Sequence, residues 1–248
     1  MTGLNVYSAN TVIRNVPIDV HIVNMSSNTI SSAPAPSEEK PAAAPYHHGN
    51  LRAALIEAGL DALRDKPAHE LSLRDLARQV GVSDNAAYRH FADKEALLMA
   101  LASEGFRRFS LAQAQAAAQG DTPQAMFEKA GQAYVRFARS HAALFQLMFG
   151  RFPAQGRSPE LVETCEAAFS GLTGLAALHA SLPQDHPAVQ MRALVAWSFV
   201  HGLSHLVLDG QLDRFSDDTD ALVNGLIAQM GAAALPALNA PSVANAPI

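Results

Sequence analysis

Apolar residues recur at helical spacing through most of the chain from Tyr46 onward. The β-branched residues in residues 1–24 have no partner strand elsewhere, and an isolated strand is not stable. Gly120–Pro123 and the stretch 150–159 interrupt the helical pattern. The pattern predicts an all-α fold with helices over residues 51–64, 72–80, 83–91, 93–118, 123–139, 141–149, 159–181, 187–209 and 217–234.

The two ends of the chain lack this periodicity. Residues 26–45 are rich in Ser, Pro and Ala, so we expect residues 1–44 to form a disordered tail. A working hypothesis takes Met25 as the true start, which the intact mass of the native protein would test. Residues 237–248 are expected to be a second flexible tail. Between the tails we expect two helical domains, 45–92 and 93–236, with helix 93–118 as the strut between them.

A tight turn joins the two short helices within residues 72–91. Ser72 and Asp75 predict a capping box at the start of the first helix. Gly81 supplies the positive φ of a sharp exit, and Ser83 can cap the second helix. Polar side chains at the start of that second helix match the helix-turn-helix design. A helical hairpin that binds no nucleic acid fits the same spacing, so residue identity has to decide.

The residue identities resemble those of the TetR family of bacterial regulators. Residues 46–52 (Tyr-His-His-Gly-Asn-Leu-Arg) are similar to the start of the first helix in one subfamily, and residues 88–98 (Tyr-Arg-His-Phe-Ala-Asp-Lys-Glu-Ala-Leu-Leu) to the family's most recognisable run. Residues 197–202 resemble the Trp-x-x-x-His-Gly sequence of one class of TetR C-terminal domains. The resemblance implies a three-helix helix-turn-helix DNA-binding domain over 45–92 and a helical ligand-binding and dimerisation domain over 93–236.

The second short helix carries the candidate base-reading residues. Asn85 can pair with adenine, Asp84 can accept from cytosine N4, and Ala86 can pack on a thymine methyl group. Arg74 either reaches a guanine or is a solvated charge paired with a neighbour. Further DNA-binding candidates, including those that the resemblance places on phosphates, are Ser72, Ser83, Tyr88, His90 and Lys94.

This segment departs from the pattern of the subfamily. Asp84-Asn85 stands where His-Ala is common, and Ala87 stands where Pro is common. An anion at the groove-facing start of a helix repels phosphate, although it favours the helix dipole. We therefore expect an operator unlike that of near relatives, with Asp84 rejecting wrong bases as well as attracting one.

Aromatic and methionine side chains in the second domain suggest a small-molecule pocket, with core packing as the alternative. His201 and His205 share a helix face, but a zinc site needs a third ligand, and no motif supplies one. We expect pocket or core histidines and no metal or cofactor. The last two predicted helices carry more apolar surface than one pair can bury, which favours a four-helix homodimer interface. The candidate pocket residues are Phe137, Phe145, Met148, Phe149, Phe152, Trp197 and His201.

Composition narrows the function further. Cys165 is the single cysteine, so no intrachain disulfide is possible, and this fits a reducing cytoplasm. A net charge of −5 disfavours a general nucleic-acid coat protein, although not a site-specific regulator. The most apolar run, 193–208, contains two histidines and is short for a membrane span, and residues 1–44 lack the basic region and continuous apolar core expected of a signal peptide. No phosphate-binding, dinucleotide or nucleophile motif points to catalysis.

These observations predict a cytoplasmic, homodimeric transcriptional regulator, most often a repressor in this family. It would bind a palindromic double-stranded DNA operator and release it when a small-molecule effector occupies the C-terminal domain. The alternative from another class is a helical dimeric ligand-binding protein without specific DNA binding. An enzyme is a more remote third interpretation.

Overall fold

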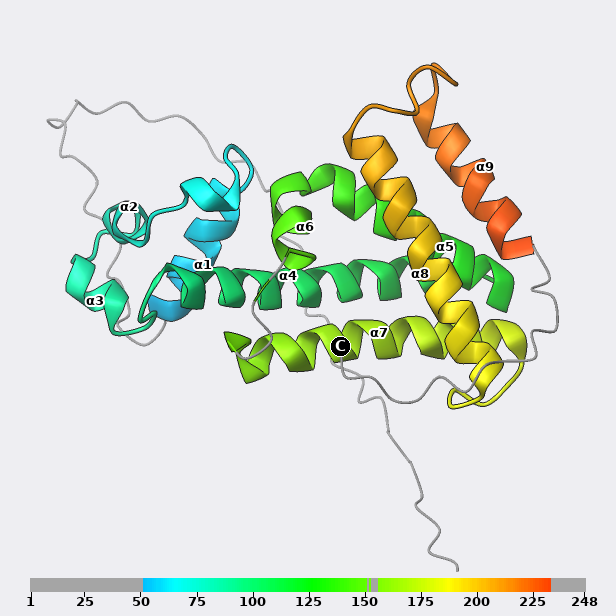
Figure 1. Ribbon diagram of the computed structural model, residues 1–248, viewed down its shortest axis with the longest axis horizontal. Coiled ribbons are helices and arrows are strands. Elements are labelled where there is room, and N and C mark those ends of the chain that lie inside the picture. Colours follow the sequence, from blue (N-terminus) through cyan, green and yellow to red (C-terminus); the bar gives the residue numbers. More distant parts are fainter. Residues whose placement is uncertain (1–50, 151, 153–155, 233–248) are drawn as a thin grey trace, which may run out of the picture. The chain divides into compact units, whose positions relative to one another are not determined.

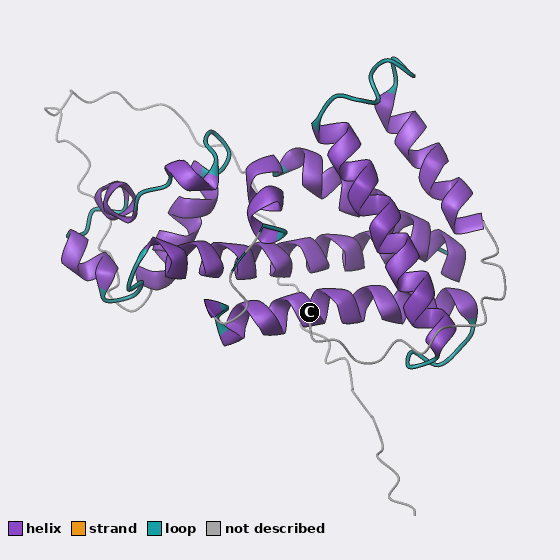
Figure 2. Cartoon of the chain, in the orientation of Figure 1, coloured by secondary structure: helices purple, strands orange, loops and turns teal. Residues whose placement is uncertain are grey.

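The computed structural model describes residues 51–150, 152 and 156–232, all within one compact unit that spans residues 46–248 (Figure 1). The described residues form helices and loops without a strand, which confirms the all-α prediction (Figure 2). The predicted tails 1–44 and 237–248, and the proposed start at Met25, lie outside these residues. The helices are α1 (Leu51–Ala62), the 3-10 helix η2 (Ala68–Glu70), α2 (Leu73–Gln79), α3 (Asp84–Tyr88), α4 (Lys94–Ala117), α5 (Pro123–Ser140), α6 (Ala142–Met148), α7 (Pro159–Ala180), α8 (Pro187–Leu208) and α9 (Thr219–Ala232).

Local capping residues set most of the helix starts. The Ser83 side chain accepts the Ala86 amide of α3, and the Asp93 carboxylate accepts the Ala96 amide of α4. Thr122 caps α5 in the same way, with Pro123 at the first helical position. These are the starts that the sequence predicts. The helix η2 was not predicted, and α3 is shorter than the predicted range 83–91.

The predicted capping box of α2 is only half formed. Ser72 Oγ accepts the Asp75 amide at 3.4 Å, as expected. The Asp75 carboxylate instead accepts a 3.1 Å hydrogen bond from Arg78 one turn later. The expectation of a reciprocal bond was therefore wrong, because an arginine three residues on competes for the same carboxylate.

The turn between α2 and α3 is a Schellman motif. Gly81 has a φ of 76°, the left-handed conformation that glycine adopts without steric cost. Its amide donates to the Arg78 carbonyl, and the Val82 amide donates to the Ala77 carbonyl, at 3.1 and 2.9 Å. This pairing ends α2 sharply and fixes the direction in which α3 leaves.

Helix α4 connects the N-terminal helices to the rest of the fold. It packs on α1, α5, α6 and α7, and Figure 1 shows it running beside α7, with α8 crossing α5 and α7. Leu97 and Leu101 of α4 are fully buried in the main apolar core, and Leu101 packs against Gly59 of α1. Gly105 permits α6 to approach closely, since a Cβ there would lie 2.7 Å from Met148 Sδ. The strut predicted from the sequence is thus a central packing element.

Two of the described helices, α7 and α8, contain long apolar stretches. Each has 22 residues and includes an 18-residue window with a mean hydropathy of 1.2, which would suffice for a membrane span by length and composition alone. These windows are longer than the run 193–208, which is the most apolar run in the sequence. Within the single chain only 17% and 28% of their most apolar windows are buried. Much of their apolar surface is therefore left for contacts outside the chain.

Candidate DNA-binding surface and ligand cavity

Helix α3 exposes polar side chains on one side, and buried residues on its opposite side hold it against the core. Asp84, Asn85 and Tyr88 are exposed, and Tyr88 is 41% accessible despite its large ring. On the opposite side Ala87 and Phe91 are buried at 0% and 2% accessibility. Because buried residues hold the helix in place, the backbone that carries the exposed side chains is rigid.

An ion pair crosses this surface between α2 and α3. Arg74 Nε lies 3.7 Å from Asp84 Oδ2, and both side chains are more than half exposed. Arg78 pairs with Asp75 on the neighbouring turn. Arg74 therefore partly neutralises Asp84, and solvent access leaves both free to exchange this contact for another.

The other candidate DNA-binding residues differ in their exposure and in the contacts that they make within the chain. His90 and Ser83 are exposed, and Ser72 is half-buried at the cap of α2. Lys94 Nζ donates to the His69 carbonyl of η2, which ties the start of α4 to the preceding loop. Ala86 is half-buried and packs on the core, so it offers less surface to a base than the sequence suggested.

A cavity of about 400 Å³ lies among α4, α5, α6, α7 and α8. Met148, Phe149, Phe152, Trp197 and His201 from the predicted set line it. Further lining residues, which the sequence analysis did not single out, are Phe106, Phe109, Gln113, Tyr134, Gly150, Arg157, Leu161, Val162, Cys165, Glu166, Ala168, Phe169 and Leu172.

Two predicted pocket residues do not line this cavity. Phe137 and Phe145 are 6% and 0% accessible and belong to the main core. Periodicity marks the apolar side of a helix but not which of its residues meets a void, so the placement of these two in a ligand site stays a prediction. The lining residues of α7 were predictable from the sequence, because Leu161, Cys165 and Phe169 recur every four residues on one helix face.

A hydrogen-bonded pair forms one polar part of the cavity wall, besides Gln113, Arg157 and Glu166. The Tyr134 hydroxyl lies 2.9 Å from Nδ1 of His201. Burial raises the pKa of the Tyr134 phenol above its ordinary value, and burial together with the nearby His205 lowers the pKa of His201. Both groups are therefore uncharged near neutral pH.

The other titratable groups of this region give little sign of redox or metal chemistry. Burial also raises the pKa of the Cys165 thiol, which disfavours the reactive thiolate. Among the residues that the structure describes, no three His, Cys, Asp or Glu side chains gather as a metal site would require.

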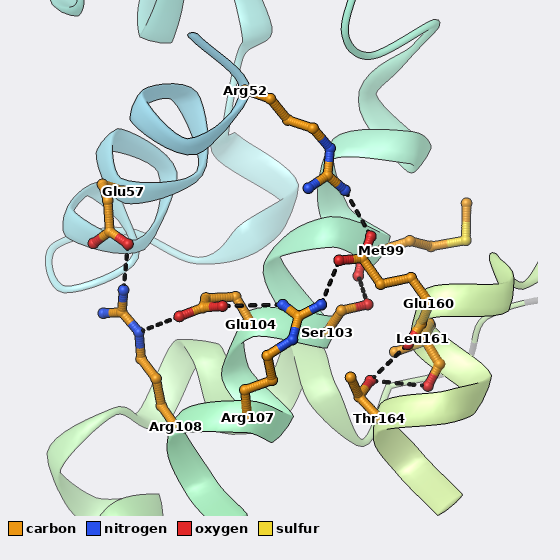
Figure 3. Close-up of polar contacts among 10 residues, drawn as sticks. All are labelled: Arg52, Glu57, Met99, Ser103, Glu104, Arg107, Arg108, Glu160, Leu161 and Thr164. Atoms are coloured by element: carbon orange, nitrogen blue, oxygen red, sulfur yellow. Dashed lines mark hydrogen bonds and ion pairs between the residues drawn. The ribbon is translucent and has the colours of Figure 1, made fainter. Parts of the chain in front are cut away.

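A chain of ion pairs connects α1 to α4 and α7 (Figure 3). Arg52 of α1 donates to Glu160 of α7 at 2.6 Å, and Arg107 of α4 donates to the same carboxylate. Arg107 and Arg108 both pair with Glu104, at 3.0 and 2.9 Å. Arg108 also donates a hydrogen bond to Glu57 of α1. We call this set the charge clasp; its members are Arg52, Glu57, Glu104, Arg107, Arg108 and Glu160.

The clasp favours the ionised form of its central carboxylate. Burial alone would raise the pKa of Glu160, but hydrogen bonds from Arg107 and Arg52 outweigh it and hold the pKa below its ordinary value. The clasp was not predicted from the sequence. Its only local signal is the spacing of Glu104 with Arg107 and Arg108, three and four residues apart on one helix.

The clasp and the cavity share two helix segments. In α4, Arg107 and Arg108 belong to the clasp, while the flanking Phe106 and Phe109 line the cavity. In α7, Glu160 belongs to the clasp and the following Leu161 lines the cavity. A displacement of either segment by a bound molecule would therefore act directly on the contact with α1.

Comparison with known proteins agrees with this architecture. The family description "Bacterial regulatory proteins, tetR family" matches residues 55–101, and "Tetracyclin repressor-like, C-terminal domain" matches residues 127–230. A solved protein of unknown function from Rhodococcus sp. RHA1 is 34% identical with a TM-score of 0.66, covering 75% of this chain and 96% of its own. The chain belongs to the TetR family. It is thus a DNA-binding transcriptional regulator, as the sequence predicted.

More distant TetR-family structures share the fold. A transcriptional regulator from Streptomyces coelicolor is 18% identical with a TM-score of 0.58, covering 72% of this chain and 78% of its own. The regulator FadR from Bacillus subtilis, solved in complex with stearoyl-CoA, is 16% identical with a TM-score of 0.55, covering 73% and 97%. A search among curated proteins finds no similar sequence. The Trp-x-x-x-His-Gly subtype, residues 197–202, stays a prediction.

Proposed function

We propose that this TetR-family protein is a cytoplasmic homodimeric repressor that releases its DNA operator when a small molecule enters the cavity. One observation carries the proposal: the segments of α4 and α7 that line the cavity also hold α1 through the charge clasp. The complex of FadR with stearoyl-CoA supports the proposal that a protein of this fold binds a ligand. No cofactor, metal or catalytic step is part of the proposal.

The DNA contacts that we propose follow the exposed side of α2 and α3. Asn85 and Asp84 stand at the start of α3, where side chains can reach base edges in a major groove. Tyr88 and His90 are exposed beyond them and can bind phosphate. Arg74 can exchange its contact with Asp84 for a base or phosphate, since the pair is largely solvated. Ser72, Ser83 and Lys94 lie at helix starts, where amides attract phosphate.

Helices α8 and α9 supply the proposed dimer interface. Val195, Ser198, Gly202 and Leu206 are exposed along one side of α8, with spacings of three and four residues. A Cβ at Gly202 would meet nothing within 4 Å in the chain itself, and the same holds for Gly225 of α9. Small residues on an apolar helix face permit close backbone approach, here by a second copy in a four-helix arrangement.

The proposed mechanism is a population shift in the dimer. Recognition helices on one face of B-DNA must be about 34–36 Å apart, or a multiple of that, so a dimer with altered spacing binds poorly. A ligand that binds better when Phe106 and Leu161 are displaced would strain the clasp and change the angle at which α1 is held. The ligand thereby favours the DNA-free state by its differential affinity for the two arrangements.

A gel-shift experiment with the promoter region beside the gene tests the proposal. We expect sequence-selective, salt-sensitive retention, a palindromic selected consensus, and loss of retention when a cavity ligand is added. Asn85→Ala should lower specific retention, whereas Gln119→Ala, a change at another exposed amide that lies between α4 and α5, should leave it intact.

A helical dimeric ligand-binding protein is the second candidate, because Asp84 places an anion on the surface proposed to meet phosphate. Equal, weak retention of every DNA sequence would favour this candidate and overturn the repressor proposal.

A further inference from the structure

The cavity wall is aromatic to an unusual degree. Seven of its eighteen lining residues are Phe, Tyr or Trp, against 6% in the whole chain. The ring centroids of Phe149 and Trp197 are 6.5 Å apart, and those of Phe169 and Trp197 are 6.2 Å apart. Edge and tilted faces at these distances provide stacking partners for a further ring. A volume of about 400 Å³ lies in the range of small-molecule sites.

The charges around the cavity disfavour an ionic ligand. Among the lining residues that the structure describes, Arg157 and Glu166 are the only Asp, Glu, Lys or Arg residues, and their formal charges cancel. Glu166 is exposed and Arg157 is half-buried, so both can keep part of their hydration. A charged ligand that entered would lose its own hydration against aromatic surface without a buried counter-ion, which is costly.

The polar anchor of the cavity is the Tyr134–His201 pair. If the Tyr134 hydroxyl donates to Nδ1, the imidazole keeps Nε2–H as a donor and the phenol oxygen remains an acceptor. In the other tautomer Nδ1–H donates to the phenol oxygen, which leaves O–H as the donor and Nε2 as the acceptor. Each arrangement retains one donor and one acceptor. A hydroxyl group, which both donates and accepts, is the ligand function that matches this pair in either state.

We infer that the cavity takes an uncharged aromatic compound with a hydroxyl group, its ring against Phe149 and Trp197 and its hydroxyl on the Tyr134–His201 pair. The inference rests on the proposed function, because it names the effector class of the proposed repressor. It differs from a lipophilic-cation site, which the aromatic faces alone would also permit. The neutral polar anchor and the cancelled rim charges favour the uncharged ligand.

Calorimetric titration of the full-length protein with four probes of similar ring size tests the inference. The probes are 4-tert-butylphenol, its methyl ether 4-tert-butylanisole, 4-tert-butylbenzoate and phenyltrimethylammonium. Trp197 is the only tryptophan in the chain, so its fluorescence reports cavity occupancy independently. We expect the phenol to bind about tenfold or more tightly than the other three, equivalent to about 1.4 kcal/mol.

Variants separate the ring contact from the hydroxyl contact. Tyr134→Phe should weaken the phenol about threefold to tenfold and leave the anisole unchanged, because it removes one hydrogen-bonding group and keeps the ring. Phe169→Leu should weaken both ligands. The matched change Phe215→Leu, at a residue that is 65% exposed and outside the cavity lining, should weaken neither.

The outcomes distinguish this inference from the proposed function. Tighter binding of the benzoate or the ammonium ion, equal binding of phenol and anisole, or no response of Trp197 to any probe overturns the hydroxyl-aromatic inference. DNA retention is measured in parallel on the same samples. If the phenol binds as expected but operator DNA is not released, the inference stands and the repressor proposal fails. If a charged probe binds and releases DNA, the repressor proposal stands and the inference fails.

Discussion

The carboxylate of Glu160, at the start of α7, accepts a 2.6 Å hydrogen bond from the guanidinium of Arg52 in α1. The two residues are 108 positions apart in the sequence, and their side chains are 31% and 45% exposed. The pair therefore joins the N-terminal helices directly to a helix of the cavity wall. The pair can favour one arrangement of α1 and α7. Because it is partly solvated, it contributes little free energy and can be broken at small cost.

Removing this pair should uncouple ligand binding from DNA release. We expect Glu160→Gln and Arg52→Gln each to destabilise the fold by less than about 1 kcal/mol, because partly exposed ion pairs contribute little. Each should also reduce the effect of a cavity ligand on operator affinity by up to about fivefold, since a coupling cannot exceed the energy of the contact that carries it. Operator affinity is measured with and without ligand, alongside thermal unfolding.

A double-mutant cycle sharpens this test. The double variant should lose little more than Glu160→Gln alone, because that change already removes the Arg52 contact together with the Arg107 contact. Asp220→Asn is the matched control, since Asp220 pairs with Arg139 between α5 and α9 and touches neither α1 nor the cavity. Additive losses in the cycle, or an equal loss of ligand response in Asp220→Asn, would remove the clasp from the mechanism.

The stability of the protein should decrease as the pH falls below the ordinary histidine range. Burial and the neighbouring His205 lower the pKa of His201 in the folded state. In the unfolded state the imidazole takes up a proton below about pH 6.5, whereas the folded state resists it, so acid favours unfolding. His201→Gln should flatten this part of the curve of unfolding free energy against pH.

Nuclear magnetic resonance provides the direct measurement. The imidazole signal that is missing from the spectrum of His201→Gln should titrate below the ordinary value in the wild type. If that signal titrates at or above the ordinary value, the assignment of a neutral His201 as partner of Tyr134 is wrong.

Local chemistry explains which parts of the fold were predictable. Ser83, Asp93 and Thr122 each accept an amide three residues ahead, so the helix starts depend only on nearby residues. The α2–α3 turn likewise follows from Gly81 alone. The half-formed capping box at Ser72 shows that such local predictions can fail, because the Asp75 carboxylate pairs with Arg78 and not with the Ser72 amide.

Features that depend on tertiary packing were not predictable in the same way. Phe145 and Phe149 are four residues apart at α6, yet only Phe149 lines the cavity and Phe145 is fully buried. The difference arises from how α4, α7 and α8 surround them, which periodicity does not encode. The Arg52–Glu160 pair has no local signal at all, since its partners meet only in the folded chain.

Asp84 should act as a selectivity element on the proposed DNA-binding surface. Asp84→Asn removes an anion that lies 3.7 Å from Arg74, so total DNA affinity at low salt should rise several-fold. Preference at one base position should change by about 1 kcal/mol or more, because the amide offers a different pattern of donors and acceptors. A base-by-base binding profile measures both effects.

Asp217→Asn provides the charge-matched control, since Asp217 is equally exposed but lies between α8 and α9. It should leave the profile and the affinity near those of the wild type. An unchanged base profile in Asp84→Asn would restrict Asp84 to a structural or purely electrostatic role.

Gly202 should be required for the proposed dimer but not for the folded subunit. Within one chain a Cβ at Gly202 meets nothing within 4 Å, and leucine is a better helix former than glycine, so Gly202→Leu should fold. Against a second copy the larger side chain would overpack the interface at a cost of about 1–3 kcal/mol, which weakens dimerisation about fivefold to 150-fold. Sedimentation over a range of protein concentrations measures this change, with helical content checked in parallel.

Gly171→Leu on α7, also in open space, should leave dimerisation unchanged. If both variants dimerise like the wild type, the interface lies elsewhere, whereas weaker dimerisation of Gly171→Leu alone would move it to α7.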